Sequence, residues 1–243
     1  MKIVKYKKVS GSKYEVELEN SEKIKLYEDV ILKENLLITK EIDDIEEIQE
    51  KNKKYEIYDV ALRYLSHHVM SIKGMKDYLL KKGYDEVDID KNINKLINSG
   101  YLNDSYYAKC YIQDKINLSN DGPKKIVKHL MDMDISYDVY REYINSDNAF
   151  WIKRITKEID KQLKVNKKSA YAFKNKMLVN LVNLGYEREM INECLSSINI
   201  SNEKELYEKE EAKIRTKLEK KYSGSELERK IKEKLYMKGF INF

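Results

Sequence analysis

Three histidines are the residues of this chain whose type most directly permits acid-base or metal chemistry. His67, His68 and His129 are the only histidines among 243 residues, so a histidine acid, base or ligand must be one of them. None stands in an HExxH motif, and the sequence contains no GxxxxGK[ST], GxGxxG or GxSxG motif. His67 and His68 fall at the end of a predicted helix, where a cation is favourable. We therefore predict no catalytic residue, no metal site and no cofactor.

Basic side chains are the second group that could carry function. The formal net charge is +5, and the excess lies in the C-terminal half. Residues 147–200 carry ten basic and six acidic side chains and residues 201–243 carry twelve and nine, whereas segments 1–55 and 56–146 each have one more acidic than basic residue. Such a surface favours an acidic or polyanionic partner, although a solvated helix face is the simpler explanation of any single run.

These basic residues form two clusters along the chain. In the larger cluster, spacings of three, four and seven place several lysines broadly on one side of a helix. Twenty tyrosines could also offer stacking platforms for nucleic acid, but most stand at positions typical of a core. We predict that a partner or DNA is contacted by Lys124, Lys125, Lys128, Lys153, Arg154, Lys157, Lys161, Lys164, Lys167 and Lys168.

A pattern that predicts a helix ending in a reversal of the chain direction occurs four times, and these helices must position the basic residues. The reversals fall at Gly83, Asp134, Gly185 and Gly239, which stand 51, 51 and 54 residues apart. Glycine commonly ends a helix in a left-handed conformation, and Asp tolerates that conformation better than most residues. A fixed period of this size indicates one supersecondary unit used repeatedly.

Apolar residues keep the same register around every reversal. Residues eight and four positions before each one share a helix face: Met75 and Leu79, Ile126 and Leu130, Met177 and Leu181, Ile231 and Leu235. A large apolar residue follows each one: Tyr84, Ile135, Tyr186 and Phe240. We expect these helices to start at Ser71, at Gly122-Pro123, at Ser169 and at a capping box over Ser225–Glu228.

The repeat divides the chain into modules of three helices. We predict modules at residues 56–105, 106–148 and 149–200, and a partial fourth at 201–243. Their first helices are expected at 58–65, 106–116 and 150–163. Their third helices carry the pairs Ile89 and Ile93, Tyr140 and Ile144, and Ile191 and Leu195. The predicted fold is mainly α, an elongated array of three-helix repeats.

Residues 1–55 form a different segment. Alternating apolar residues between positions 3 and 27 predict a small antiparallel β-meander, followed by helices near 29–35 and 43–51. The polar run Glu50–Lys54 is either a hinge or one exposed turn of a continuous helix. No apolar run is long enough for a membrane span or a signal peptide, and two cysteines outside any CxxC indicate no disulfide framework, so we expect a cytoplasmic monomer.

Several phrases together resemble the RecX family of bacterial recombination regulators, over nearly the whole chain. They are Ala61–Ser66, Lys76–Tyr84, Gly100–Asp104 with Tyr107-Ala108, and Gly122–Ile126. The resemblance implies a protein without enzymatic activity that binds the RecA recombinase filament on single-stranded DNA. Lying in the groove of the filament, it would limit ATP hydrolysis, strand exchange and filament growth.

One departure from the family pattern affects the expected contacts. Where the family commonly has Arg-Pro-Arg-Ser, this chain has His68-Val69-Met70-Ser71, so two arginines are absent. We therefore expect no guanidinium contacts at this position, and we expect the basic surface on the third module instead. A helical-repeat protein that binds single-stranded or duplex DNA directly, and affects recombination by competing for DNA, is the alternative function.

Overall fold

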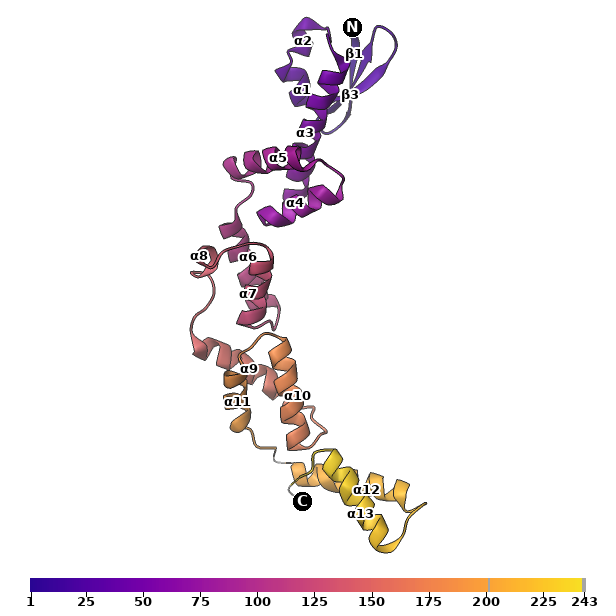
Figure 1. The fold of residues 1–243 in the computed structure, drawn as a ribbon, viewed down its shortest axis with the longest axis vertical. Helices are drawn as coiled ribbons and strands as arrows, with labels where there is room; N and C mark the ends of the chain where they lie inside the picture. Colours follow the sequence, from indigo (N-terminus) through magenta and orange to yellow (C-terminus); the bar gives the residue numbers. More distant parts are fainter. Residues whose placement is uncertain (201, 242–243) are drawn as a thin grey trace. The chain divides into compact units, whose positions relative to one another are not determined.

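The structure, a computed structural model, describes residues 1–200 and 202–241. Three strands and thirteen helices lie within these residues (Figure 1). Ser201, Asn242 and Phe243, part of the predicted fourth module, lie outside the described residues. The chain divides into two compact units: residues 1–110 with 133–135, and residues 111–132 with 136–243. The predicted mainly helical fold with a small N-terminal sheet is confirmed, and its elongated arrangement stays a prediction.

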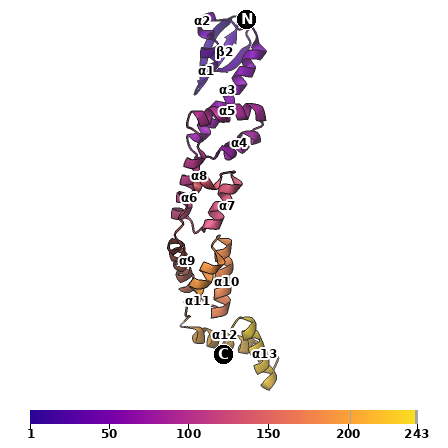
Figure 2. The ribbon, with the colours of Figure 1, turned by 60° about the vertical axis from the view of Figure 1, so that its left-hand side comes forward.

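The first unit begins with the predicted meander. Strands β1 (Ile3–Ser10), β2 (Lys13–Leu18) and β3 (Lys23–Tyr27) form an antiparallel sheet in the order β1-β2-β3. Helices α1 (Glu28–Lys33) and α2 (Leu36–Thr39) follow it, and α3 (Ile45–Leu65) continues toward the first module (Figures 1 and 2). Val16, Leu18 and Leu26 are buried in a core that also receives Ile48 of α3.

Helix α3 connects this segment to the first three-helix module. It runs unbroken through the polar residues 50–54, so the run is part of a continuous helix and not a hinge, although Lys51 and Asn52 within it are half-buried rather than exposed. Its C-terminal half packs with α4 (Ile72–Lys81) and α5 (Glu86–Asn98). Ile57, Ala61, Met75, Leu79 and Ile93 share one buried cluster, which confirms the predicted stripes of this module.

The remaining helices follow in the predicted order. The second set comprises α6 (Asp104–Leu118), α7 (Pro123–Asp132) and α8 (Tyr137–Tyr140). The third set comprises α9 (Asn148–Leu163), α10 (Ala170–Asn183) and α11 (Arg188–Ser196). The last set comprises α12 (Glu203–Leu218) and α13 (Gly224–Met237). All eight apolar residues predicted to precede the reversals are buried.

The four reversals have the predicted left-handed geometry. The φ angles are +85° at Gly83, +58° at Asp134, +89° at Gly185 and +85° at Gly239. After the last two glycines, the N–H groups of Tyr186 and Phe240 donate to the carbonyls of Leu181 and Leu235 at 3.1 Å. These bonds satisfy carbonyls that the helix end leaves open.

Two local predictions are wrong. Helix α8 is a single turn, and Ile144 lies beyond its end. Asn145 accepts hydrogen bonds from Asp147 N–H and from the Trp151 indole, and these bonds hold the chain in a turn that competes with the helix. The capping box at Ser225 does not form either: α13 begins at Gly224, and both carboxylate oxygens of Glu228 accept hydrogen bonds from Arg215.

The predicted starts of the other repeat helices are confirmed. Ser71 Oγ accepts from Gly74 N–H at 3.0 Å, and Ser169 Oγ accepts from Ala172 N–H at 3.2 Å. Helix α7 begins at Pro123. Within the residues that the structure describes, no helix combines the length and apolar character needed to cross a membrane.

Candidate functional site: a basic groove at a module junction

Backbone-to-backbone contact joins the second and third modules. The turn after α10 lies against the start of α7, where Gly122 N–H donates to Leu184 O at 2.6 Å and Lys124 N–H donates to Gly185 O at 3.0 Å. Carbonyls at one helix end thus satisfy N–H groups at another helix start. A Cβ atom on Gly122 would lie 2.7 Å from the carbonyl of Gly185, and one on Gly185 would lie 2.5 Å from Lys125 N. Both glycines are therefore required for this approach.

Two other junctions use the same parts of successive modules. At the next one, Ser169 Oγ donates to Lys238 O at 2.8 Å, and a Cβ atom on Gly239 would lie 2.7 Å from that hydroxyl oxygen. In the first unit, the Asp134 carboxylate pairs with Lys73 Nζ in the first turn of α4 at 3.0 Å. Each reversal after the first thus meets the start of the preceding module's second helix.

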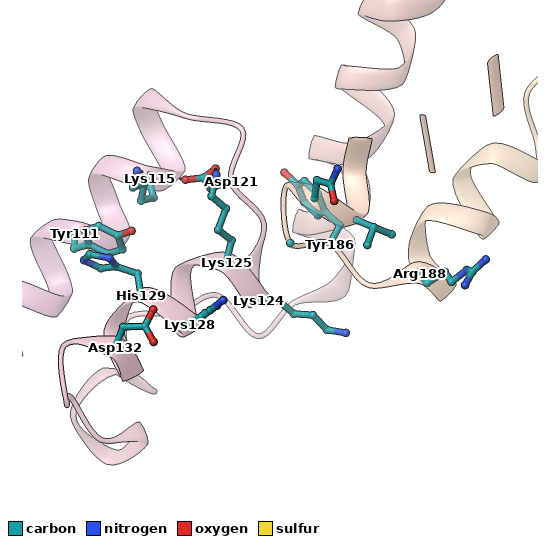
Figure 3. A pocket seen from close by; sticks show the side chains of 13 residues that line it. Tyr111, Lys115, Asp121, Lys124, Lys125, Lys128, His129, Asp132, Tyr186 and Arg188 are labelled. Atoms are coloured by element: carbon teal, nitrogen blue, oxygen red, sulfur yellow. Dashed lines mark hydrogen bonds and ion pairs between the residues drawn. The ribbon is translucent and has the colours of Figure 1, made fainter. Parts of the chain in front are cut away.

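A groove with a volume of about 640 Å³ opens beside the Gly122–Gly185 junction (Figure 3). Helices α6 and α7 supply Lys115, Lys124, Lys125 and Lys128, and α11 supplies Arg188. The acidic residues that line it are Asp121 and Asp132. Five cations against two carboxylates give the groove a positive net charge, which favours an anionic ligand.

Asp121 holds two of these lysines in place. Its carboxylate is largely buried and contacts Lys125 Nζ at 2.7 Å and Lys115 Nζ at 3.3 Å. Burial alone would raise the pKa of Asp121, but the hydrogen bonds from Lys125 and Lys115 outweigh it and lower the pKa below its ordinary value. Since two ammonium groups share one carboxylate, this cluster retains a positive charge.

The other cations of the groove differ in how far they are engaged. Lys124 Nζ pairs with Glu187 at 2.6 Å, across the junction. Lys128 and Arg188 are exposed and form no ion pair with any residue that the structure describes. These two side chains are the most available cations, and they come from different modules.

An aromatic pair lines the same groove. The rings of Tyr111 and His129 are stacked, with centroids 4.1 Å apart and planes inclined by 17°. Burial and the nearby Lys115 lower the pKa of His129, against an opposing effect of Asp132. This environment favours the neutral imidazole, and the lysines and Arg188 supply the positive charge of the groove.

A second surface carries most of the larger predicted cluster. Lys153, Lys157, Lys161 and Lys164 are exposed along α9, and none forms an ion pair within residues 1–200 and 202–241. The opposite face of α9 buries Trp151, Ile155 and Ile159. Four of the five lysines predicted to share this face therefore lie on it, together with the exposed Asp160, whereas the fifth, Lys168, lies beyond the end of α9.

Arg154 belongs to neither surface. Its Nη1 donates to Ile116 O and its Nη2 to Ser119 O, both at 2.6 Å. The guanidinium thus fastens α9 to the end of α6 through Nη1 and Nη2, whereas its buried Nε has no hydrogen-bond partner among the described residues. Its position in a stretch rich in basic residues led us to predict Arg154 as a contact residue, but the carbonyls that it meets are 35 or more positions away and give no signal in the sequence.

Lys167 and Lys168 lie at the Ser169–Gly239 junction. They line a groove of about 460 Å³ together with Tyr171 and Tyr236. The ten predicted residues therefore separate into two junction grooves, the α9 face and the internal Arg154. Sequence reasoning did not place Lys115, Arg188, Tyr111 or His129 at this groove, because it counted only clustered basic residues. Arg188 of α11 comes from the next module, whereas Tyr111 and Lys115 of α6 and His129 of α7 belong to the same module as Lys124, Lys125 and Lys128.

Successive sets of helices, with basic grooves at two of their junctions, define a tandem helical-repeat protein. The family model for RecX, first three-helix domain, matches residues 58–96. Regulatory protein RecX of Lactococcus lactis subsp. cremoris (strain MG1363) is 30% identical over 246 residues, covering 94% of this chain and 90% of that protein. Regulatory protein RecX of Listeria monocytogenes serovar 1/2a is 30% identical over 204 residues, covering 81% and 75%.

Solved structures show the same fold. A crystal structure of regulatory protein RecX is similar with a TM-score of 0.64 and 19% identity, covering 79% of this chain and 97% of that one. RecX from Lactobacillus salivarius is similar with a TM-score of 0.53 and 25% identity, covering 60% and 96%. The chain belongs to the RecX family of regulatory proteins.

Proposed function

We propose that this protein binds the RecA recombinase filament on single-stranded DNA and restrains its ATP hydrolysis, strand exchange and growth. The observation that carries the proposal is the 30% identity to a RecX regulatory protein over 94% of the chain. The protein acts by occupying the groove of the filament as a monomer in the cytoplasm, and it catalyses no reaction itself.

The exposed lysines of α9 support a binding role of this kind. Lys153, Lys157, Lys161 and Lys164 stand opposite the buried face of the helix, so they can meet a partner without disturbing the core. Unpaired surface cations steer association with an anionic assembly and raise its rate, an effect that salt weakens. Several modules in series let one chain contact neighbouring subunits of a filament.

An ATPase titration tests the function. The DNA-dependent ATPase of the recombinase from the same organism is measured on single-stranded DNA while this protein is added up to an equal molar ratio. We expect hydrolysis to slow progressively. Unchanged hydrolysis across the titration, with a sample shown by circular dichroism to be folded, would refute the proposal.

A charge-reversal variant tests the α9 face. Lysine to glutamate changes at Lys153, Lys157, Lys161 and Lys164 should weaken inhibition and leave the helical spectrum intact. The matched control carries four such changes at exposed lysines of the sheet segment that form no ion pair with any described residue: Lys2, Lys5, Lys7 and Lys25. Equal inhibition by both variants would remove α9 from the contact surface.

A further inference from the structure

We infer that the groove beside Gly122 and Gly185 binds the phosphate backbone of a single strand of nucleic acid. The inference deepens the proposed function, and rests on it, by naming a place where this protein touches the DNA strand carried by the filament. Lys128 and Arg188 make the principal contacts, and the Lys115–Asp121–Lys125 cluster supplies a fixed positive charge behind them.

The geometry of the cations supports phosphate as the ligand. The ammonium groups of Lys115 and Lys125 are both held by the buried Asp121, so they lose little side-chain freedom when an anion arrives. Lys128 lies on α7 and Arg188 begins α11 (Figure 3). A strand that contacts both would therefore touch two modules at once and stabilise their junction.

Two observations favour nucleic acid over an acidic peptide. The stacked rings of Tyr111 and His129 line the groove, and a neutral aromatic surface beside lysines suits a chain that carries bases and sugars between its charges. The Ser169–Gly239 junction repeats the arrangement, with Lys167, Lys168 and two tyrosines lining its own groove. Two such grooves at successive junctions match a ligand whose charge is repeated along its length.

Salt dependence gives the size of the expected effect. Each phosphate contact on a single strand contributes about 0.7 to the slope of log affinity against log salt, because binding releases a counterion. Replacing Lys128 and Arg188 by glutamine should therefore reduce the slope by about 1.4, and weaken binding by roughly tenfold or more at low salt.

The test uses the full chain, a short fluorescein-labelled oligothymidylate and no recombinase, with affinity measured by anisotropy over a potassium chloride series. The variant K128Q/R188Q is compared with K5Q/K7Q, which removes from β1 two exposed charges that form no ion pair in the part of the chain that the structure describes. We expect the slope to fall for the first variant alone. Equal slopes for the wild type and K128Q/R188Q would overturn the inference.

Two further measurements separate the remaining outcomes. An oligonucleotide carrying 5-bromouracil should cross-link to the peptide that contains Tyr111, and cross-links confined to other modules would also overturn the site. Polyglutamate at equal charge should compete poorly, since equal competition would assign the groove to acidic polymers in general. If the oligonucleotide binds as described but the ATPase of the recombinase is unaffected, the groove stands and the proposed function fails.

Discussion

The substitution Gly185→Ala, compared with Gly83→Ala, isolates the contact between the second and third modules. Both glycines end the second helix of a module in the left-handed region, with φ angles of +89° and +85°. A Cβ atom on Gly83 would meet no described atom within 4 Å, whereas one on Gly185 would lie 2.5 Å from Lys125 N and 2.6 Å from Lys125 Cβ. The two variants therefore share the free-energy cost of placing alanine in a left-handed conformation. They differ because only the Gly185 variant also disturbs the contact between the modules.

The expected cost of each change follows from this difference. Placing alanine in the left-handed region costs about 1–2 kcal/mol, and that is the whole effect expected for Gly83→Ala. Gly185→Ala also separates the junction and breaks the bonds from Gly122 N–H to Leu184 O and from Lys124 N–H to Gly185 O. Each such bond contributes about 0.5–1.5 kcal/mol, so this variant should lose about 1–3 kcal/mol more than the other.

Urea titration followed by two signals measures these losses. Circular dichroism reports on all helices, whereas fluorescence reports on the single tryptophan, Trp151, which is buried in the third module and lies 6.3 Å from the Tyr186 ring. Gly185→Ala should shift the fluorescence transition to lower urea, and Gly83→Ala should leave it in place.

Hydrogen exchange supplies the local readout of the same contact. The amides of Gly122 and Lys124 should exchange faster in Gly185→Ala, because their acceptors withdraw, and at the wild-type rate in Gly83→Ala. If the two variants lose equal free energy and these amides remain protected, the modules are not held together by the turn, and the reasoning is refuted.

Three further predictions concern other contacts of the fold. Arg154→Lys should lower the free energy of unfolding by about 2 kcal/mol, because one ammonium cannot replace the two guanidinium hydrogen bonds to Ile116 O and Ser119 O. Urea titration followed by Trp151 fluorescence measures the loss, and an unchanged free energy would contradict the role of these two bonds. Ser71→Ala should lower the free energy of unfolding by about 1 kcal/mol through the loss of a helix cap. Ser169→Ala should lower it further, because Ser169 Oγ caps a helix and also donates to Lys238 O across a junction. Equal melting temperatures of the two variants would argue against the bond to Lys238 O. In the folded protein, burial and the nearby Lys115 lower the pKa of His129, although Asp132 opposes them. As the pH falls, the unfolded chain therefore takes up this proton before the folded protein does. Stability should fall as the pH drops below about 6.5. His129→Gln should flatten that part of the melting profile, and an unchanged slope would contradict the assignment.

Much of the repeat could be predicted because its signals are local. The apolar pairs such as Met177 and Leu181 report one helix face, and Gly185 reports the left-handed turn that ends it. Asp134 was predicted as a substitute for glycine on conformational grounds alone. The structure gives it a contact as well, with Lys73.

The junctions could not be predicted because they join residues far apart in the sequence. Gly122 was interpreted as a helix start, which it is, but nothing near it indicates that Gly185 lies against it. The basic groove has the same origin, since Arg188 joins Lys128 only when the turn after α10 meets the start of α7. Arg154 was assigned to the surface for the same reason, as its acceptors lie on another helix.

We therefore expect stability and the inferred binding of a nucleic-acid strand to be coupled at this junction. The glycines that let two backbones touch also bring Lys128 and Arg188 to one groove, so a substitution that separates the modules should also separate the two cations. A strand bound to both would in turn oppose that separation, because a ligand stabilises the state that it binds. Gly185→Ala should accordingly weaken oligothymidylate binding although it removes no charge, and added oligothymidylate should slow the exchange of the Gly122 and Lys124 amides in the wild type.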